Sequence, residues 1–367
     1  MTDFKNLYRK NVAAFAEVPV PPLKEELLAA NGLTKAACLD SNENPLGASP
    51  KAQAALAKEL ANLNRYPEPG STLLRQALAE RYNLHADNII ISNGGDNIIT
   101  TMMNSFIDDG DEILVSNPYF FVYGVESGLL GGKIVAVEPN ADLSCDFEAM
   151  LSAITPKTKL IMITNPNNPT GKVIEKKALT DFLDKVPQDV LVVLDEAYAE
   201  FVPTAEYADC IDYVRAEKNV LIIRTFSKLY GLAGLRIGYA LAAKPLIANM
   251  RKAIETFPVN RLAQAAAAAA LTDTEFVQAT IEHANQSREY LQKEFTALGL
   301  DMVSGSANFC FVNLHTDSKP VVAELANRGI FVKNGYGWGY PEYARISFGT
   351  DEENQWLVRE LKDILSK

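Results

Sequence analysis

The sequence predicts an α/β protein with a doubly wound, mostly parallel sheet of seven strands, followed by a smaller α+β unit. The first observation is a series of short apolar runs, rich in Ile and Val, with helical stretches between them. Runs that are apolar on both faces are typical of parallel strands buried beneath helices. The second observation is a change of pattern, after about residue 250, to long helices and then short strands. The seven runs lie at 88–92, 111–116, 133–138, 159–164, 189–195, 219–225 and 237–242.

The chain divides into three predicted parts. Residues 1–38, which include the proline cluster "EVPVPPL", form an arm that packs on the small domain and at a dimer interface. Residues 39–250 form the large domain, and residues 251–367 form the small α+β domain, with a helix crossing between the two. An alanine-rich stretch opens the last part and favours a helix. The small domain's predicted elements are a helix at 261–273, strands at 309–314, 329–334 and 344–349, and a closing helix at 351–365.

Composition excludes several classes of protein. A formal net charge of −11 argues against a nucleic-acid surface, which needs a basic patch. Four cysteines without a Cys-x-x-Cys pair predict reduced thiols, and three scattered histidines predict no metal site. No apolar stretch approaches the length of a membrane span, so we expect no membrane partner and a cytoplasmic location.

The residues that follow the apolar runs carry the chemistry, because ligands of open α/β sheets bind beyond the carboxyl ends of the strands. The run at 159–164 is followed by "NPNNPTG", which a plain loop could also contain. Asp195 and Tyr198 follow the next run; a buried carboxylate needs a good partner, although a helix cap is the alternative. Lys228 follows the run at 219–225. A lysine there has a readily shifted pKa, which suits Schiff-base chemistry, although a surface loop would also hold one.

The spacing of these residues separates the alternatives. Asn168 precedes Asp195 by 27 residues, Tyr198 precedes Lys228 by 30, and Arg236 follows Lys228 by 8. This constellation resembles the fold type I aminotransferases, which use pyridoxal phosphate, over nearly the whole chain. The resemblance implies that the large domain binds this cofactor and that Lys228 forms the imine with its aldehyde.

The resemblance also implies the roles of the residues around the cofactor ring. Asp195 corresponds to the carboxylate that keeps the ring nitrogen protonated, so that the ring can accept the electron pair of the broken Cα–H bond. Lys228 is then the base that moves the proton between Cα and C4′. Asn168 and Tyr198 donate to the phenolic oxygen. Phe120, in "NPYFFVY", corresponds to the ring stacked on the cofactor, with a core aromatic as the alternative.

A phosphate cradle is predicted at "SNGGDN", where a strand meets a helix. A helix N-terminus offers free N–H groups and partial positive charge, and a forked guanidinium completes an anion site. The predicted cradle comprises Gly94, Gly95, Asp96, Thr225, Ser227 and Arg236.

Four motifs are similar to the histidinol-phosphate aminotransferase branch: "LDSNENPLG", "RYPEP", "NPNNPTG" and "RTFSKLYGLAGLRIGY". The resemblance implies a homodimer in which Tyr66 reaches the partner's cofactor phosphate. It also implies that Arg345, in "ARISFGT", binds the substrate anion, although an arginine in a strand could be a surface residue. The predicted reaction is a ping-pong exchange of an amino group between a substrate such as histidinol phosphate and the 2-oxoglutarate/glutamate pair, with glutamate as the amino donor and 2-oxoglutarate as its product.

Three departures from the branch leave the substrate open. Lys333 stands where the branch has a second arginine. The position of the branch's tyrosine that contacts the substrate phosphate falls near Glu17 in this chain, with Phe15 close by. The branch's "GADE" motif reads "GGDN" here. We predict Arg345, Lys333, Asn168 and Glu17 as substrate-binding residues. The alternatives are an aminotransferase for aromatic or other amino acids and a lyase or decarboxylase on the same fold. A nicotinamide oxidoreductase is disfavoured because no Gly-x-Gly-x-x-Gly turn occurs. A regulatory module that retains the cofactor is a further alternative, but such regulators normally carry a basic DNA-binding segment, which this sequence lacks.

Overall fold

The large sheet has the seven strands that the sequence predicts. A computed structural model describes residues 4–17, 23–203 and 210–366 of the chain. Within them, the strands follow the order β2-β8-β7-β6-β5-β3-β4, and only β8 runs antiparallel to its neighbours. The predicted fold class is therefore confirmed. The strands are β2 Ile89–Ser92, β3 Glu112–Ser116, β4 Lys133–Val137, β5 Thr158–Thr164, β6 Leu191–Asp195, β7 Val220–Thr225 and β8 Gly238–Ala242.

Helices cover both faces of this sheet, because alternate residues of each strand point to opposite sides. On one face, Val193 and Ile223 pack with Met102 of α5 and with α10. On the other face, Val192 and Ile222 pack with α4, α7, α8 and α9. The helices of this part are α3 Pro50–Glu59, α4 Thr72–Tyr82, α5 Gly94–Phe106, α6 Val122–Leu130, α7 Phe147–Ser152, α8 Lys176–Leu183, α9 Ile211–Arg215 and α10 Lys244–Met250.

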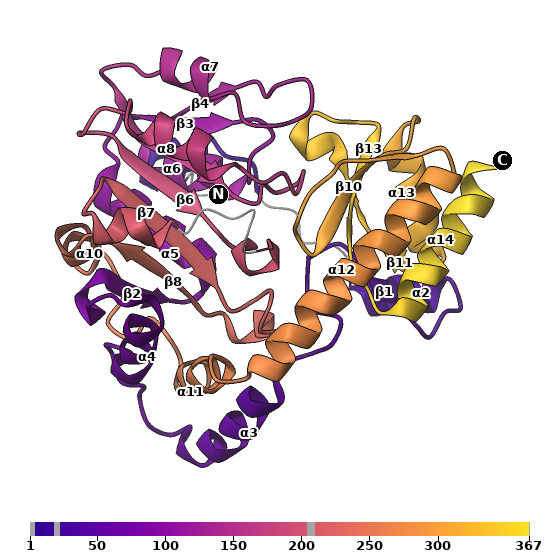
Figure 1. Cartoon of the computed structure of the whole chain (residues 1–367), viewed down its shortest axis with the longest axis horizontal. Coiled ribbons are helices and arrows are strands. Elements are labelled where there is room, and N and C mark those ends of the chain that lie inside the picture. Colours follow the sequence, from indigo (N-terminus) through magenta and orange to yellow (C-terminus); the bar gives the residue numbers. More distant parts are fainter. Residues whose placement is uncertain (1–3, 18–22, 204–209, 367) are drawn as a thin grey trace.

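Two helices lead from the large sheet to the small one. The alanine-rich helix α11 (Arg261–Ala270) begins at the capping residue Asn260 and packs on α3 and α4. Small side chains allow this close approach, as Ala263, Ala266 and Ala267 are fully buried. The long helix α12 (Thr274–Ala297) then crosses to the small unit, as predicted (Figure 1).

The small unit is an antiparallel sheet with helices on it. Its strands follow the order β12-β13-β10-β9. The run predicted as one strand at 329–334 forms two short ones, and the first, β11, pairs with β1 near the start of the chain. Helix α14 covers exactly the predicted residues and begins with a capping box between Thr350 and Glu353. The elements are β1 Ala37–Cys38, β9 Asp301–Met302, β10 Phe309–Asn313, β11 Ile330–Phe331, β12 Lys333–Asn334, β13 Tyr343–Ser347, α13 Ser318–Asn327 and α14 Asp351–Leu365.

The segment before β1 contacts both parts of the molecule. Helix α1 (Lys10–Ala13) packs on α6 of the large sheet, and α2 (Lys24–Ala30) packs on α13 of the small unit. The division into an arm, a large domain and a small domain, with boundaries at residues 38 and 250, stays a prediction.

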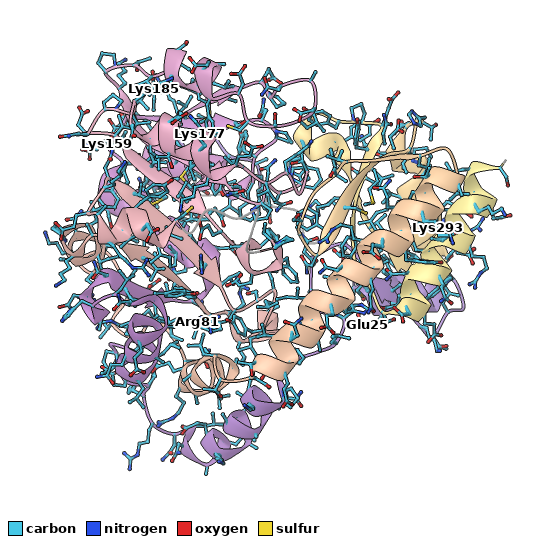
Figure 2. The ribbon with its side chains drawn as sticks, in the orientation of Figure 1. Glu25, Arg81, Lys159, Lys177, Lys185 and Lys293 are labelled. Carbon is cyan, nitrogen blue, oxygen red and sulfur yellow. The ribbon has the colours of Figure 1, made fainter. Side chains whose placement is uncertain are left out.

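Charged side chains point outward over much of the surface. Figure 2 shows Lys177 and Lys185 beside the large sheet and Lys293 on α12 in such positions. Among the described residues, no helix combines the length and the apolar character that a bilayer span requires.

Candidate active site

A cavity of about 460 Å³ opens at the carboxyl ends of β5, β6 and β7. The start of α5 and the edge of the small sheet also contribute to it. Strand ends meet here because parallel strands that run side by side all finish at one edge of the sheet. The predicted site residues that line this cavity are Gly95, Asp96, Phe120, Asn168, Asp195, Tyr198, Thr225, Ser227, Lys228, Lys333, Arg236 and Arg345.

Lys228 projects into the cavity three residues after β7. Its Nζ donates a hydrogen bond to the carbonyl oxygen of Ser41, at 2.8 Å, and lies 5.9 Å from the centre of the Tyr198 ring. Burial, helped by the positive charge of Arg345, lowers the pKa of Lys228 to about 8. A much larger fraction of neutral amine therefore exists near pH 7 than for an exposed lysine, and the neutral amine is the nucleophile.

Asp195 ends β6 and is buried. Burial raises the pKa of its carboxyl to about 6, while hydrogen bonds from Tyr123 Oη (2.6 Å) and the Ala197 amide (3.2 Å) act in the opposite direction. At pH 7 the carboxylate is thus still mostly ionised, with both oxygens held in place.

Tyr198 and Asn168 line the same cavity and are each held by a hydrogen bond from another part of the chain. Asn42 Nδ2 donates to Tyr198 Oη at 2.9 Å, and burial raises the pKa of this phenol. Asn168 Oδ1 accepts a bond from Arg345 Nη1 at 2.7 Å. Asn42, which follows β1, and Arg345 on β13 thereby position side chains at the end of the large sheet.

Residues predicted to form a phosphate cradle meet where α5 begins. Gly94 has φ +85°, and a Cβ there would lie 2.8 Å from Arg236 Nη2. The same Nη2 donates to Asp96 Oδ2 at 3.1 Å. Asn93 makes no side-chain cap, so the first amides of this 13-residue helix remain without that partner. Free amides beside a guanidinium fit a phosphate group.

The opposite wall of the cavity carries two cationic side chains on adjacent strands. Arg345 on β13 is paired with Lys333 on β12. The Arg345 guanidinium lies 5.3 Å from the Trp338 ring centre and 5.6 Å from that of Phe309, and its Nη2 donates to the Asp40 carbonyl at 2.5 Å. Burial lowers the pKa of both cations. This wall suits an anionic group of a substrate.

Comparison with known families decides the identity of this arrangement. Residues 34–361 match the family "Aminotransferase class I and II". The chain belongs to this aminotransferase family. The predicted family and the prediction of a transaminase are therefore confirmed.

Relatives of this aminotransferase match over nearly the whole chain. It is 41% identical to histidinol-phosphate aminotransferase of Moorella thermoacetica, over 95% of this chain and 90% of that protein. It is 39% identical to histidinol-phosphate aminotransferase 2 of Pseudomonas aeruginosa, over the full length of both. The crystal structure of histidinol-phosphate aminotransferase from Sinorhizobium meliloti in complex with pyridoxal-5′-phosphate superposes with a TM-score of 0.91. That match has 27% identity and covers 98% of this chain and 97% of that chain.

Three predicted site residues of the aminotransferase lie outside the cavity lining. Gly94 lies against the Arg236 guanidinium, since a Cβ at this glycine would be 2.8 Å from Arg236 Nη2. Tyr66 is 80% exposed and stacks on Phe257 with ring centres 4.6 Å apart. Glu17 is exposed, in a segment where the Phe15 ring packs close to Gly128 of α6. The structure of this one chain does not bring Tyr66 or Glu17 to the cavity.

The aminotransferase site also contains residues that sequence reasoning did not single out. Asn42 lies within the motif "LDSNENPLG", and Tyr123 lies within "NPYFFVY", so each belonged to a stretch already identified. The hydrogen bonds from Asn42 to Tyr198 and from Tyr123 to Asp195 could not be predicted from local sequence patterns, because each bond joins residues more than 70 positions apart. Trp338, in a short turn before β13, carried no motif at all.

Proposed function

We propose that this chain is a histidinol-phosphate aminotransferase that moves an amino group between histidinol phosphate and 2-oxoglutarate by a ping-pong mechanism. The observation that carries the proposal is the presence of Lys228, with its lowered pKa, and buried Asp195 in one cavity with a cationic wall. The full-length relatives at about 40% identity support the same substrate.

The cofactor is pyridoxal phosphate, and the donor set fits it. When bound, its ring supplies an electron sink for the substrate Cα–H bond. We assign covalent attachment to Lys228, the ring nitrogen to Asp195, the phenolic oxygen to Asn168 and Tyr198, and ring stacking to Phe120. Gly94, Gly95, Asp96, Thr225, Ser227 and Arg236 form the phosphate cradle; the Ser227 amide already donates to Thr225 Oγ1 at 3.0 Å.

Lys228 also handles the proton. With the substrate amine in place of Nζ on the cofactor, the free Lys228 amine would accept the proton from the substrate Cα and pass it to C4′ of the cofactor. Because burial lowers the pKa of this amine to about 8, about half of it is neutral and able to accept a proton at pH 8.

Arg345 and Lys333 bind the substrate's anionic group in this proposal. Glu17 was predicted beside them; because it is exposed in the single chain, its place at the substrate remains a prediction. Phe121 and Trp338 also line the cavity, and the Lys333 ammonium lies 6.0 Å from the Phe121 ring. These aromatic side chains favour an aromatic amino acid as the second candidate substrate.

A substrate screen tests the proposed function. Purified protein with pyridoxal phosphate and 2-oxoglutarate is assayed with histidinol phosphate, phenylalanine, tyrosine and other amino acids. We expect the highest kcat/KM for histidinol phosphate. Fast turnover of an aromatic amino acid with none of histidinol phosphate would replace the first candidate by the second. Release of carbon dioxide, with no glutamate formed, would indicate a decarboxylase.

A homodimer is part of the proposal. Tyr66 follows exposed Leu60 and Leu63 in the sequence and stacks on Phe257, and these exposed apolar side chains suit a second copy of the chain. If Tyr66 serves the partner's phosphate, mixing Lys228→Ala and Tyr66→Ala variants should restore turnover, since one site of the mixed dimer is intact. Failure to restore it, with mixed dimers demonstrated, would contradict this role. A cytoplasmic location remains our expectation.

A further inference from the structure

Tyr123 makes a short hydrogen bond to the acid that we assign to the ring nitrogen. Its Oη lies 2.6 Å from Asp195 Oδ2 and 2.8 Å from Thr164 Oγ1. An ionised carboxylate only accepts hydrogen bonds. The single phenol hydrogen is therefore donated to Asp195, and the Thr164 hydroxyl donates to the phenol oxygen. The three groups form an ordered chain in which each donor strengthens the next.

The fold holds Tyr123 in one place. Its side chain has no exposed surface, and it lies in the first turn of α6, where its ring meets the Phe120 ring edge-to-face with centres 5.7 Å apart. Thr164 and Asp195 are register partners on β5 and β6. From the first turn of α6, the phenol thus contacts the ends of the adjacent strands β5 and β6. Phe120, the residue predicted to stack on the cofactor, lies just before this helix.

The surroundings of Asp195 explain why such a donor is needed. Burial and the negative charges of Asp96 and Glu196 all favour the neutral acid. The neighbouring Glu196 pairs with a different residue, because its Oε2 accepts bonds from Arg224 Nε and Nη2 at 2.9 and 2.7 Å. The described donors to the Asp195 carboxylate are the Ala197 amide and the Tyr123 phenol.

We propose that Tyr123 is a positioning residue that keeps Asp195 ionised and directed at the cofactor's ring nitrogen. The inference rests on the proposed role of Asp195 and goes beyond it, since Tyr123 does not line the cavity. Loss of the phenol should leave a neutral acid, which cannot hold a protonated ring nitrogen by charge. The loss of cofactor affinity caused by removing the phenol should therefore depend on the presence of the ring nitrogen.

The test compares two cofactors in binding measurements on the apoprotein. One is pyridoxal phosphate, and the other is its analogue with a CH group in place of the ring nitrogen. For Tyr123→Phe we expect the dissociation constant of pyridoxal phosphate to rise about tenfold or more, the scale of one hydrogen bond to a charged group. The dissociation constant of the analogue should change much less. Tyr213→Phe is the matched control, because it removes a buried phenol bonded to Thr180 at 2.6 Å, away from the cavity.

Each outcome decides between distinct conclusions. An equal loss of affinity for both cofactors, or no loss for either, would overturn the role of Tyr123 while leaving Asp195 in place. If the wild-type protein itself does not prefer pyridoxal phosphate to the analogue, the role of Asp195 fails and this inference fails with it. Thr164→Val provides the second variant if Tyr123→Phe does not fold. It should show the same nitrogen-dependent loss, smaller in size, and its absence would overturn the proposal.

Discussion

At the scale of single residues, the site depends on how burial changes two titratable groups in opposite senses. Burial disfavours the charged form of each, so it lowers the pKa of the Lys228 amine to about 8 and raises that of the Asp195 acid to about 6. The interval between about pH 6 and pH 8 is where Asp195 is charged while the neutral fraction of Lys228 is rising. Both conditions favour cofactor attachment in our assignment.

The lowered pKa of Lys228 predicts a pH dependence. Only the neutral amine attacks an aldehyde, so the rate of pyridoxal phosphate attachment to the apoprotein should rise with pH and level off above about 8, well below the 10.5 of an ordinary lysine. Stopped-flow absorbance of the cofactor measures this rate. Lys228→Ala should show no attachment at any pH. A rate still climbing steeply at pH 10 would contradict the lowered pKa.

Arg345→Ala should impair substrate use far more than cofactor binding. Removing one partner of a buried, hydrogen-bonded charge pair costs about 2 to 5 kcal/mol, so kcat/KM should fall by about 30-fold or more. Steady-state kinetics and the dissociation constant of pyridoxal phosphate separate the two effects. Arg345→Lys keeps the charge and should recover part of the loss. The opposite pattern, a lost cofactor with an intact KM, would move Arg345 out of the substrate site.

At the scale of elements, the contact between the start of α5 and Arg236 depends on a glycine. Residue 94 adopts φ +85°, which L side chains rarely adopt, and a Cβ there would lie 2.8 Å from the guanidinium. The glycine therefore serves two needs at once, the backbone conformation and the space for Arg236. The two needs are separable by experiment, because Gly110 has φ +90° with nothing within 4 Å of its Cβ position.

Gly94→Ala should weaken cofactor binding, whereas Gly110→Ala should not. Both variants should lose about 1 to 2 kcal/mol of unfolding free energy from the left-handed backbone, measured by denaturant titration. Only the substitution at 94 also displaces Arg236, so only that variant should bind inorganic phosphate and pyridoxal phosphate more weakly. Equal cofactor affinity in the two variants would show that this contact is unimportant for the cradle.

At the scale of the whole molecule, a buried polar cluster joins α4 to three strands of the sheet behind the site. Arg224 of β7 pairs with Glu196 after β6 and donates to Tyr82 Oη of α4 at 3.0 Å. Tyr82 in turn bonds Tyr239 of β8 at 2.7 Å. Glu196 has no exposed side-chain surface, so loss of its charge would leave Arg224 buried without its hydrogen-bonded counter-ion.

Glu196→Gln should therefore lower the unfolding free energy by about 3 to 5 kcal/mol. The matched control is Glu148→Gln, because Glu148 forms an ion pair with Lys185 at 3.0 Å on the surface, where both side chains are exposed. That change should cost at most about 1 kcal/mol. Equilibrium unfolding in urea measures both values. A similar small loss for both variants would show that the buried pair contributes little.

Much of the fold and of the site was predictable because local patterns carried the necessary information. The seven large-sheet strands were predicted to within a few residues, since a strand buried on both faces is largely apolar, as in residues 220–223 of β7. Lys228 and Asp195 were predictable for a related reason: a polar residue at or just after the end of such a strand lies at the sheet edge where ligands bind. Their spacing, which resembles that of the aminotransferases, then singled them out.

Contacts between distant segments were beyond the reach of local patterns. The pairing of β1 with β11, the bond from Asn42 to Tyr198 and the bond from Tyr123 to Asp195 each join parts of the chain whose spacing follows no rule. The sequence alone determined which chemical groups stand at the strand ends, because apolar periodicity reports burial. Tertiary structure alone decided which donors those groups meet and hence their pKa values, because hydrogen bonding and desolvation depend on neighbours in space.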